Sequence, residues 1–193
     1  MVICQVILAD WLFSMDKEFH YHTSFFNNIK VFHPFSHFGL EPDALMNVGR
    51  KRIDEGVFDQ PYIYQVKIEY EPHELVEVDK DWGTPKPIGI ASVLRYALGR
   101  EWYEPMEKIR SDLCDKKNQV GGKEWVNQYG YQPIFDFLAN EGVVAIKYPN
   151  IVEANGEPSL CLVVPARAKI LNSRPLTTAE IDQAVADYIS SQK

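Results

Sequence analysis

The chain has 193 residues, of which 46% are hydrophobic and 12% aromatic, a composition that supports a packed core and argues against long disordered stretches. Its net charge of −7 excludes sequence-independent binding to nucleic acid over a generally basic surface, because such binding depends on Lys and Arg at phosphates. A nucleic-acid target reached by a small basic patch stays open. The three cysteines, Cys4, Cys114 and Cys161, are far apart and odd in number, which indicates free thiols in a reducing cytoplasm.

Residues 1–14 form an N-terminal segment in which Val2 to Phe13 is nearly all apolar but interrupted by Asp10. This run is too short to cross a membrane and lacks the basic start of a signal peptide. The sequence predicts a core strand or short helix here, or an extension if Met15 is the natural start. We expect one domain over residues 15–171 and a C-terminal helix within residues 172–193 that docks on it.

Alternating apolar and polar side chains mark the expected strands. Glu18 to Ser24 would place His20 and His22 on one face of a strand. Pro61 to Tyr70 is the clearest strand, and Leu75 to Val78 is a second, shorter one.

The expected helices follow from capping patterns and helical spacing. Glu41-Pro42-Asp43 suits a helix start, because Pro fits the first turn and acids favour the N-terminal dipole. Thr177 and Glu180 form a capping box before an amphipathic stretch. Lys116 to Gly122 is the most linker-like stretch. Further helices are predicted within residues 25–31, 88–100, 102–114 and 125–140.

The stretch from Ala145 to Ile170 predicts a strand, a polar turn and a second strand, because apolar runs of strand length flank an Asn-Gly turn. Two carboxylates, Glu153 and Glu157, lie in this turn. They are either catalytic groups braced by rigid strands or acids of a solvated hairpin loop. Irregular interleaving of short strands and helices along the chain predicts the α+β class and not a doubly wound sheet.

Several kinds of site find little support. His20 with His22, and His33 with His37, resemble metal-ligand pairs, but Pro34 and Gly39 disfavour the helix that the second pair needs, and we expect no structural metal. The glycines match neither the P-loop nor the dinucleotide-binding fingerprint.

Three stretches in a fixed order carry a resemblance to a known family. They are Tyr21-His22-Thr23-Ser24, then His37-Phe38-Gly39, then Tyr148-x-Asn150-x-x-Glu153 followed by Ser159. Together they resemble the three motifs of the ADP-ribosyltransferase superfamily, in its phage-type and bacterial members. The resemblance spans roughly Phe19 to Leu171.

The resemblance implies a split β-sandwich of short mixed strands flanked by helices, with NAD as the substrate. It implies that His22 positions the adenosine ribose, that Phe38 stacks near the nicotinamide and that Glu153 or Glu157 is the catalytic acid. It also implies that the acceptor of ADP-ribose is a protein or nucleic acid, that the reaction takes place in the cytoplasm and that no membrane is involved. The remaining residues that it assigns to NAD binding are Thr23, Ser24, His37, Gly39 and Asn150.

Two departures from the family pattern leave an alternative open. Thr23 follows the first-motif histidine where many members have glycine, and Ser159 or Leu160 stands where many have the catalytic Glu at the start of the last strand. The alternative is a catalytically inactive binding or inhibitor protein on the same scaffold. Hydrolysis of NAD without an acceptor would differ from transfer only in its product.

Overall fold

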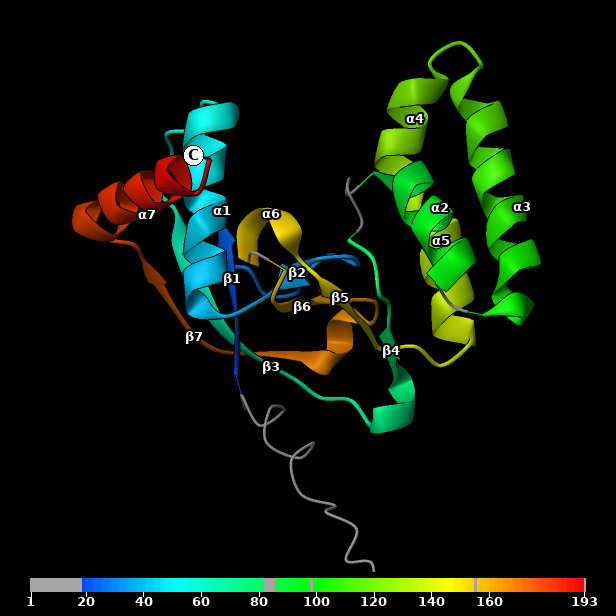
Figure 1. Cartoon of the computed structure of the whole chain (residues 1–193), viewed down its shortest axis with the longest axis horizontal. Helices are drawn as coiled ribbons and strands as arrows, with labels where there is room; N and C mark the ends of the chain where they lie inside the picture. Colours follow the sequence, from blue (N-terminus) through cyan, green and yellow to red (C-terminus); the bar gives the residue numbers. More distant parts are fainter. Residues whose placement is uncertain (1–18, 82–85, 98, 155, 193) are drawn as a thin grey trace, which may run out of the picture.

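The computed structural model describes residues 19–81, 86–97, 99–154 and 156–192. Two small sheets lie at the centre, with one group of helices on one side and a pair of helices on the other (Figure 1). The α+β class predicted from the sequence is confirmed. The N-terminal segment 1–14, for which a strand, a helix or an extension was predicted, lies outside the described residues.

The first sheet is antiparallel, with the order β1-β3-β7. Strands β1 (His20–Ser24) and β3 (Tyr62–Ile68) confirm the two strands predicted around these residues. Strand β7 (Ala168–Pro175) runs through residue 171, where the sequence analysis ended the domain. The C-terminal segment therefore continues directly from the sheet.

The second sheet has the order β2-β6-β5-β4. It consists of β2 (His37–Phe38), β6 (Pro158–Leu162), β5 (Ala145–Pro149) and β4 (Leu75–Glu77). Strands β5 and β6 form the predicted hairpin, but its turn contains a single helical turn, α6 (Ile151–Ala154). Strand β4 pairs with β5 in parallel, whereas the other pairs are antiparallel.

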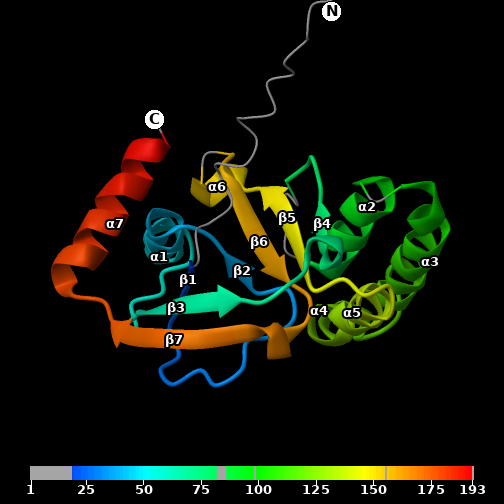
Figure 2. The ribbon, with the colours of Figure 1, turned by 90° about the horizontal axis from the view of Figure 1, so that it is seen from below.

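The two sheets share a hydrophobic core, and a main-chain bridge joins them. Phe38 and Leu162 of the second sheet pack in the same cluster as Tyr64 of the first, where β3 and β7 cross below β6 (Figure 2). Tyr21 and Gly39 exchange main-chain hydrogen bonds of 2.9 and 3.1 Å. This bridge sets β1 beside β2, and it brings the first two motifs together.

Four helices between β4 and β5 build a second core of their own. They are α2 (Pro87–Ala97), α3 (Arg100–Lys117), α4 (Gly122–Tyr129) and α5 (Tyr131–Asn140). Buried side chains from all four pack in one cluster with residues of β5 and β6. Two short 3-10 helices complete the connections, η1 (Pro72–Glu74) and η2 (Pro165–Arg167).

Of three local predictions, the helix expected within residues 25–31 is wrong. The helix predicted within residues 125–140 is observed as α5. A separate helix, α4, precedes it and ends at Gly130, and Pro133 has no N–H to donate to the Tyr129 carbonyl, so the two do not run on as one helix. Residues 25–31 form bends and not a helix, and Asn28 has a positive φ of 62°. The linker-like stretch Lys116 to Gly122 contains the tight turn of residues 118–121 that joins α3 to α4.

Helices α1 (Glu41–Asp54) and α7 (Thr178–Ser191) pack closely against each other. A Cβ atom added at Gly49 would lie 2.3 Å from the main-chain oxygen of Ala184 and 2.8 Å from the Cβ of Tyr188. Only a residue without a side chain therefore fits at this crossing. The helix openings predicted at Glu41 and at the Thr177 capping box are both confirmed.

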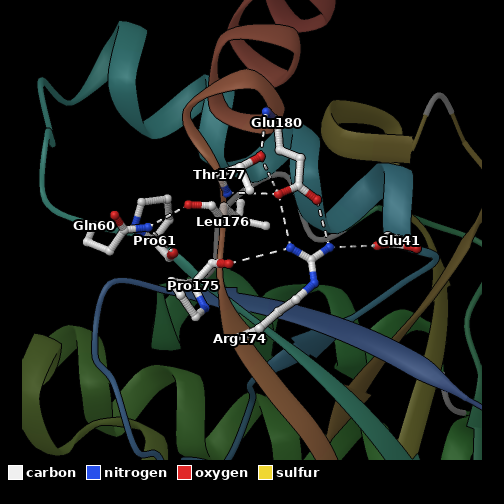
Figure 3. A network of polar contacts seen from close by, with 8 residues as sticks. All are labelled: Glu41, Gln60, Pro61, Arg174, Pro175, Leu176, Thr177 and Glu180. Atoms are coloured by element: carbon white, nitrogen blue, oxygen red, sulfur yellow. Dashed lines mark hydrogen bonds and ion pairs between the residues drawn. The ribbon is translucent and has the colours of Figure 1, made fainter.

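A polar network ties the end of β7 to the start of α7 (Figure 3). The guanidinium of Arg174 donates to both carboxylate oxygens of Glu180 at 3.0 and 2.7 Å and lies 3.7 Å from Glu41 at the start of α1. The Gln60 amide donates to the Leu176 carbonyl at 2.8 Å. Because α1 also packs on β1, this network fixes the helix that supports the first motif.

Candidate functional site

His22 on β1 is held by the backbone of β2. Its Nδ1 atom lies 2.8 Å from the carbonyl oxygen of His37, and a carbonyl only accepts, so the Nδ1 of His22 carries the proton. In the neutral ring, Nε2 is then a hydrogen-bond acceptor. The fold therefore presents an acceptor nitrogen on a half-buried ring, a group suited to a ligand hydroxyl.

The side chain of His37 continues this chain of contacts to β5. Its Nδ1 lies 2.6 Å from the hydroxyl oxygen of Tyr148, and the two rings meet edge to face with centroids 5.4 Å apart. Strands β1, β2 and β5, which carry the three motifs, are thus joined through two consecutive polar contacts. Residues that lie 126 positions apart, His22 and Tyr148, belong to one hydrogen-bonded unit.

Both histidines are neutral at pH 7. The pKa of His37 is lowered to about 4, chiefly by burial and also by the nearby His22, whereas Asp81 opposes the shift. Burial also lowers the pKa of His22, against the opposing effect of its bond to the His37 carbonyl. The unit can therefore orient and hydrogen-bond a ligand without carrying positive charge.

A buried polar corner lies beside Gly39. The Asn150 side-chain amide donates to Ser159 Oγ at 3.2 Å, and both side chains are buried. A Cβ atom added at Gly39 would lie 3.3 Å from this Oγ and 2.9 Å from a carboxylate oxygen of Asp43, which itself accepts the Leu40 N–H at 2.8 Å. The glycine is needed here for close approach of β2 to the corner.

The helical turn α6 is built on Asn150. The Asn150 carbonyl accepts the N–H groups of Ala154 and Gly156 at 3.2 and 2.8 Å. Asp81 caps the start of this turn, with its carboxylate accepting the Ile151 N–H at 2.9 Å. The backbone of Glu153 therefore sits on a turn that is fixed from both ends, and this turn packs against α1.

The second candidate acid, Glu157, lies where the chain returns from α6 to β6. Its side chain is exposed, and its main-chain groups make hydrogen bonds within the turn. Its N–H donates to Ala154 at 2.8 Å, and its carbonyl accepts from Asn150 at 3.1 Å. Glu153 and Glu157 thus belong to one turn, but only Glu153 lies on α6 itself.

Two predicted NAD-binding side chains serve the core. Phe38 is 1% exposed and packs against the rings of Phe32 and His22, so its ring contributes to the core, and its stacking near nicotinamide stays a prediction. The buried hydroxyl of Thr23 donates to the Ala44 carbonyl at 2.8 Å and joins β1 to α1. Phe38 thus packs against the ring of His22, and Thr23 holds the strand of His22 against α1.

Ser24 ends β1, and its hydroxyl accepts the Phe26 N–H at 3.1 Å in the loop that follows. Sequence reasoning assigned no binding or catalytic role to Asp81, Tyr148 or Ser159, although two of them stand inside the third motif. The alternation of β5 could have placed Tyr148 and Ile146 on one face. Asp81 follows β4 in the parallel pair and had no local signal, because its partners lie 70 residues away.

Three general findings complete the description of the site: they concern metal-binding groups, membrane-spanning helices and similarity to known proteins. Among the residues that the structure describes, no group of three or more His, Cys, Asp or Glu is placed to hold a metal ion. None of the helices within that part of the chain has the length and apolar character needed to cross a bilayer. Comparisons with protein-family models, curated proteins and solved structures find no match to this chain.

Proposed function

We propose that this protein is an ADP-ribosyltransferase that cleaves the nicotinamide–ribose bond of NAD and transfers ADP-ribose to a protein or nucleic-acid acceptor. One observation carries the proposal: the three stretches that resemble the family's motifs meet in one polar unit, through His22, His37 and Tyr148. In this proposal the two packed sheets correspond to the split β-sandwich of that family.

Cleavage of the nicotinamide–ribose bond needs few catalytic groups. Nicotinamide is bound as a cation and leaves as a neutral molecule, so no general acid has to protonate it, unlike the leaving oxygen in ordinary glycoside hydrolysis. One carboxylate suffices to stabilise positive charge that develops on the ribose. By analogy with other fixed electrostatic groups, its removal costs about 2–4 kcal/mol of transition-state stabilisation.

The residues of the chain supply binding and orientation in this scheme. The acceptor Nε2 of His22 receives a ribose hydroxyl, and its position is fixed by the His37 carbonyl. Glu153 supplies the carboxylate from α6, a turn anchored by Asn150 and Asp81. His37 and Tyr148 hold β2 and β5 at a constant spacing.

The test is turnover of labelled NAD by the purified protein in a cell lysate and in buffer, comparing Glu153→Gln with Glu157→Gln. We expect Glu153→Gln to lower nicotinamide release by about 30–900-fold. Glu157→Gln, the matched control on the same turn, should stay within about threefold of the original protein, since its side chain is exposed. Absence of both nicotinamide release and label transfer, or full activity in both variants, overturns the proposal.

A second candidate function, a catalytically inactive binding or inhibitor protein, is favoured by one observation. Ser159 occupies the start of β6, where many family members carry the catalytic acid, and its hydroxyl is buried against Asn150. Calorimetry separates the two candidates: NAD binding without turnover supports the second, and turnover excludes it.

A further inference from the structure

A pocket of about 980 Å³ opens between the loop before β2 and the helices α4 and α5. Aromatic rings from both sides line it: Phe35 and Tyr131 lie with centroids 5.8 Å apart, and Trp125 and Tyr129 with centroids 5.7 Å apart. Trp125 and Tyr129 are 40% and 50% exposed. Large exposed aromatic side chains at a concave surface are typical of binding hot spots.

The pocket carries negative charge. Among the described residues that line it, Asp136 is the one carboxylate, and none is a lysine or an arginine. Asp136 accepts a hydrogen bond from Gln132 one helical turn earlier, at 2.7 Å, which orients the carboxylate and leaves its negative charge in place. His37 also lines the pocket, and its pKa of about 4 leaves it neutral at pH 7.

Electron-rich ring faces and a single carboxylate together attract a planar cation. Trp125 already shows this property, because the ammonium of Lys116 lies 5.2 Å from its ring centroid. Lys116 does not line the pocket, and its ammonium donates to Gln119 at 3.1 Å. A guanidinium group is suited to such a site, since it stacks on aromatic faces and pairs with a carboxylate through two parallel hydrogen bonds.

We propose that this pocket binds an arginine side chain of a partner polypeptide. The exposed rim formed by Trp125, Gln128 and Tyr129 offers surface for residues on either side of the arginine, and the volume exceeds what one guanidinium fills. The net charge of −7 adds long-range attraction for a basic segment. This binding does not depend on the proposed NAD chemistry and can be measured without it.

The test is titration of the full chain with short blocked peptides, followed by NMR shifts of the indole N–H signals. The probes are Gly-Arg-Gly, the same peptide with citrulline in place of arginine, and methylguanidinium. Citrulline keeps the shape of arginine but lacks the charge. We expect the arginine peptide to bind at least about fivefold more tightly than the citrulline peptide, as one cation–π contact and one exposed ion pair allow.

Two variants locate the interaction. Asp136→Asn should weaken arginine-peptide binding about threefold to fivefold, whereas Asp112→Asn, an exposed acid of α3 that pairs with Lys108, should leave it unchanged. Equal binding of the citrulline peptide, or equal loss in both variants, overturns the cation site. Equal affinity for methylguanidinium and for the peptide would overturn the proposal that the ligand is part of a polypeptide. The citrulline comparison uses the unaltered protein, so it holds even if a variant fails to fold.

Discussion

The Nδ1 of His22 donates to the main-chain carbonyl of His37 across 2.8 Å, so the ring of the first histidine is oriented by the backbone of the second. The side chain of His37 is in turn bonded to Tyr148. A change at any of these three residues is therefore expected to act on the others, and their effects should not add independently.

Replacement of His22 by alanine should weaken NAD binding by about fivefold, because one hydrogen bond to a ribose hydroxyl contributes about 1 kcal/mol net. Isothermal calorimetry with NAD measures this. His73→Ala is the matched control, since His73 is exposed on η1, outside the polar unit. An equal loss of affinity in both variants would contradict the role given to His22.

Removal of the hydroxyl in Tyr148→Phe should lower the free energy of unfolding by about 1–3 kcal/mol, because the ring nitrogen of His37 loses its 2.6 Å partner in a partly buried place. Urea denaturation measures this change. Tyr129→Phe alters an exposed tyrosine and should change stability by less than about 0.5 kcal/mol. A Tyr148→Phe protein as stable as the original would show that this contact contributes nothing.

The stability of the fold should depend on pH through its histidines. The folded pKa values of His20, His22 and His37 are lowered from 6.5, the last to about 4, so the unfolded chain binds more protons between pH 6.5 and 4. The free energy of unfolding is therefore fully kept above pH 6.5 and falls as the pH drops toward 4.

Thermal melts at half-unit steps of pH measure this slope. His37→Gln should flatten it between pH 6.5 and 4, and His73→Gln should not. Glu180, whose pKa is lowered to about 2 chiefly by its hydrogen bond from Arg174, acts in a separate window. Its contribution is present above pH 4.5 and is lost as the pH falls toward 2. A slope in His37→Gln as steep as in the original protein would contradict the contribution of His37.

Gly49→Ala should destabilise the protein although alanine favours a helix more than glycine does. The added methyl would meet the Ala184 oxygen at 2.3 Å, and this overpacking costs about 1–3 kcal/mol, more than the roughly 1 kcal/mol of helix propensity gained. Chemical denaturation measures the net loss. Ser190→Ala changes an exposed position of the same helix pair and should be neutral or slightly stabilising.

The regular elements were largely predictable, because they depend on local patterns. The alternation around β3, the Pro42 helix start and the Thr177 capping box each correspond to the observed element. The helix α4 before Gly130 was not predicted separately; it is distinct from α5 because Pro133 has no N–H to donate to the Tyr129 carbonyl.

The site was predictable only in part. The motif order pointed to His22 and His37, which do meet, but it could not tell that Phe38 faces the core. Asp81 was missed because its role comes from the parallel pairing of β4 with β5, which joins distant segments. Contacts of this kind have no signature in the neighbouring sequence.

The parallel pairing of β4 with β5 also sets an order for synthesis on the ribosome. Strand β4 cannot pair until Ala145 and the rest of β5 have been translated. The helices between β4 and β5 form largely from contacts close in sequence and can assemble earlier. At roughly 5–20 residues per second, this delay lasts several seconds. During this delay β4 has no partner strand, because β5 is its neighbour in the sheet.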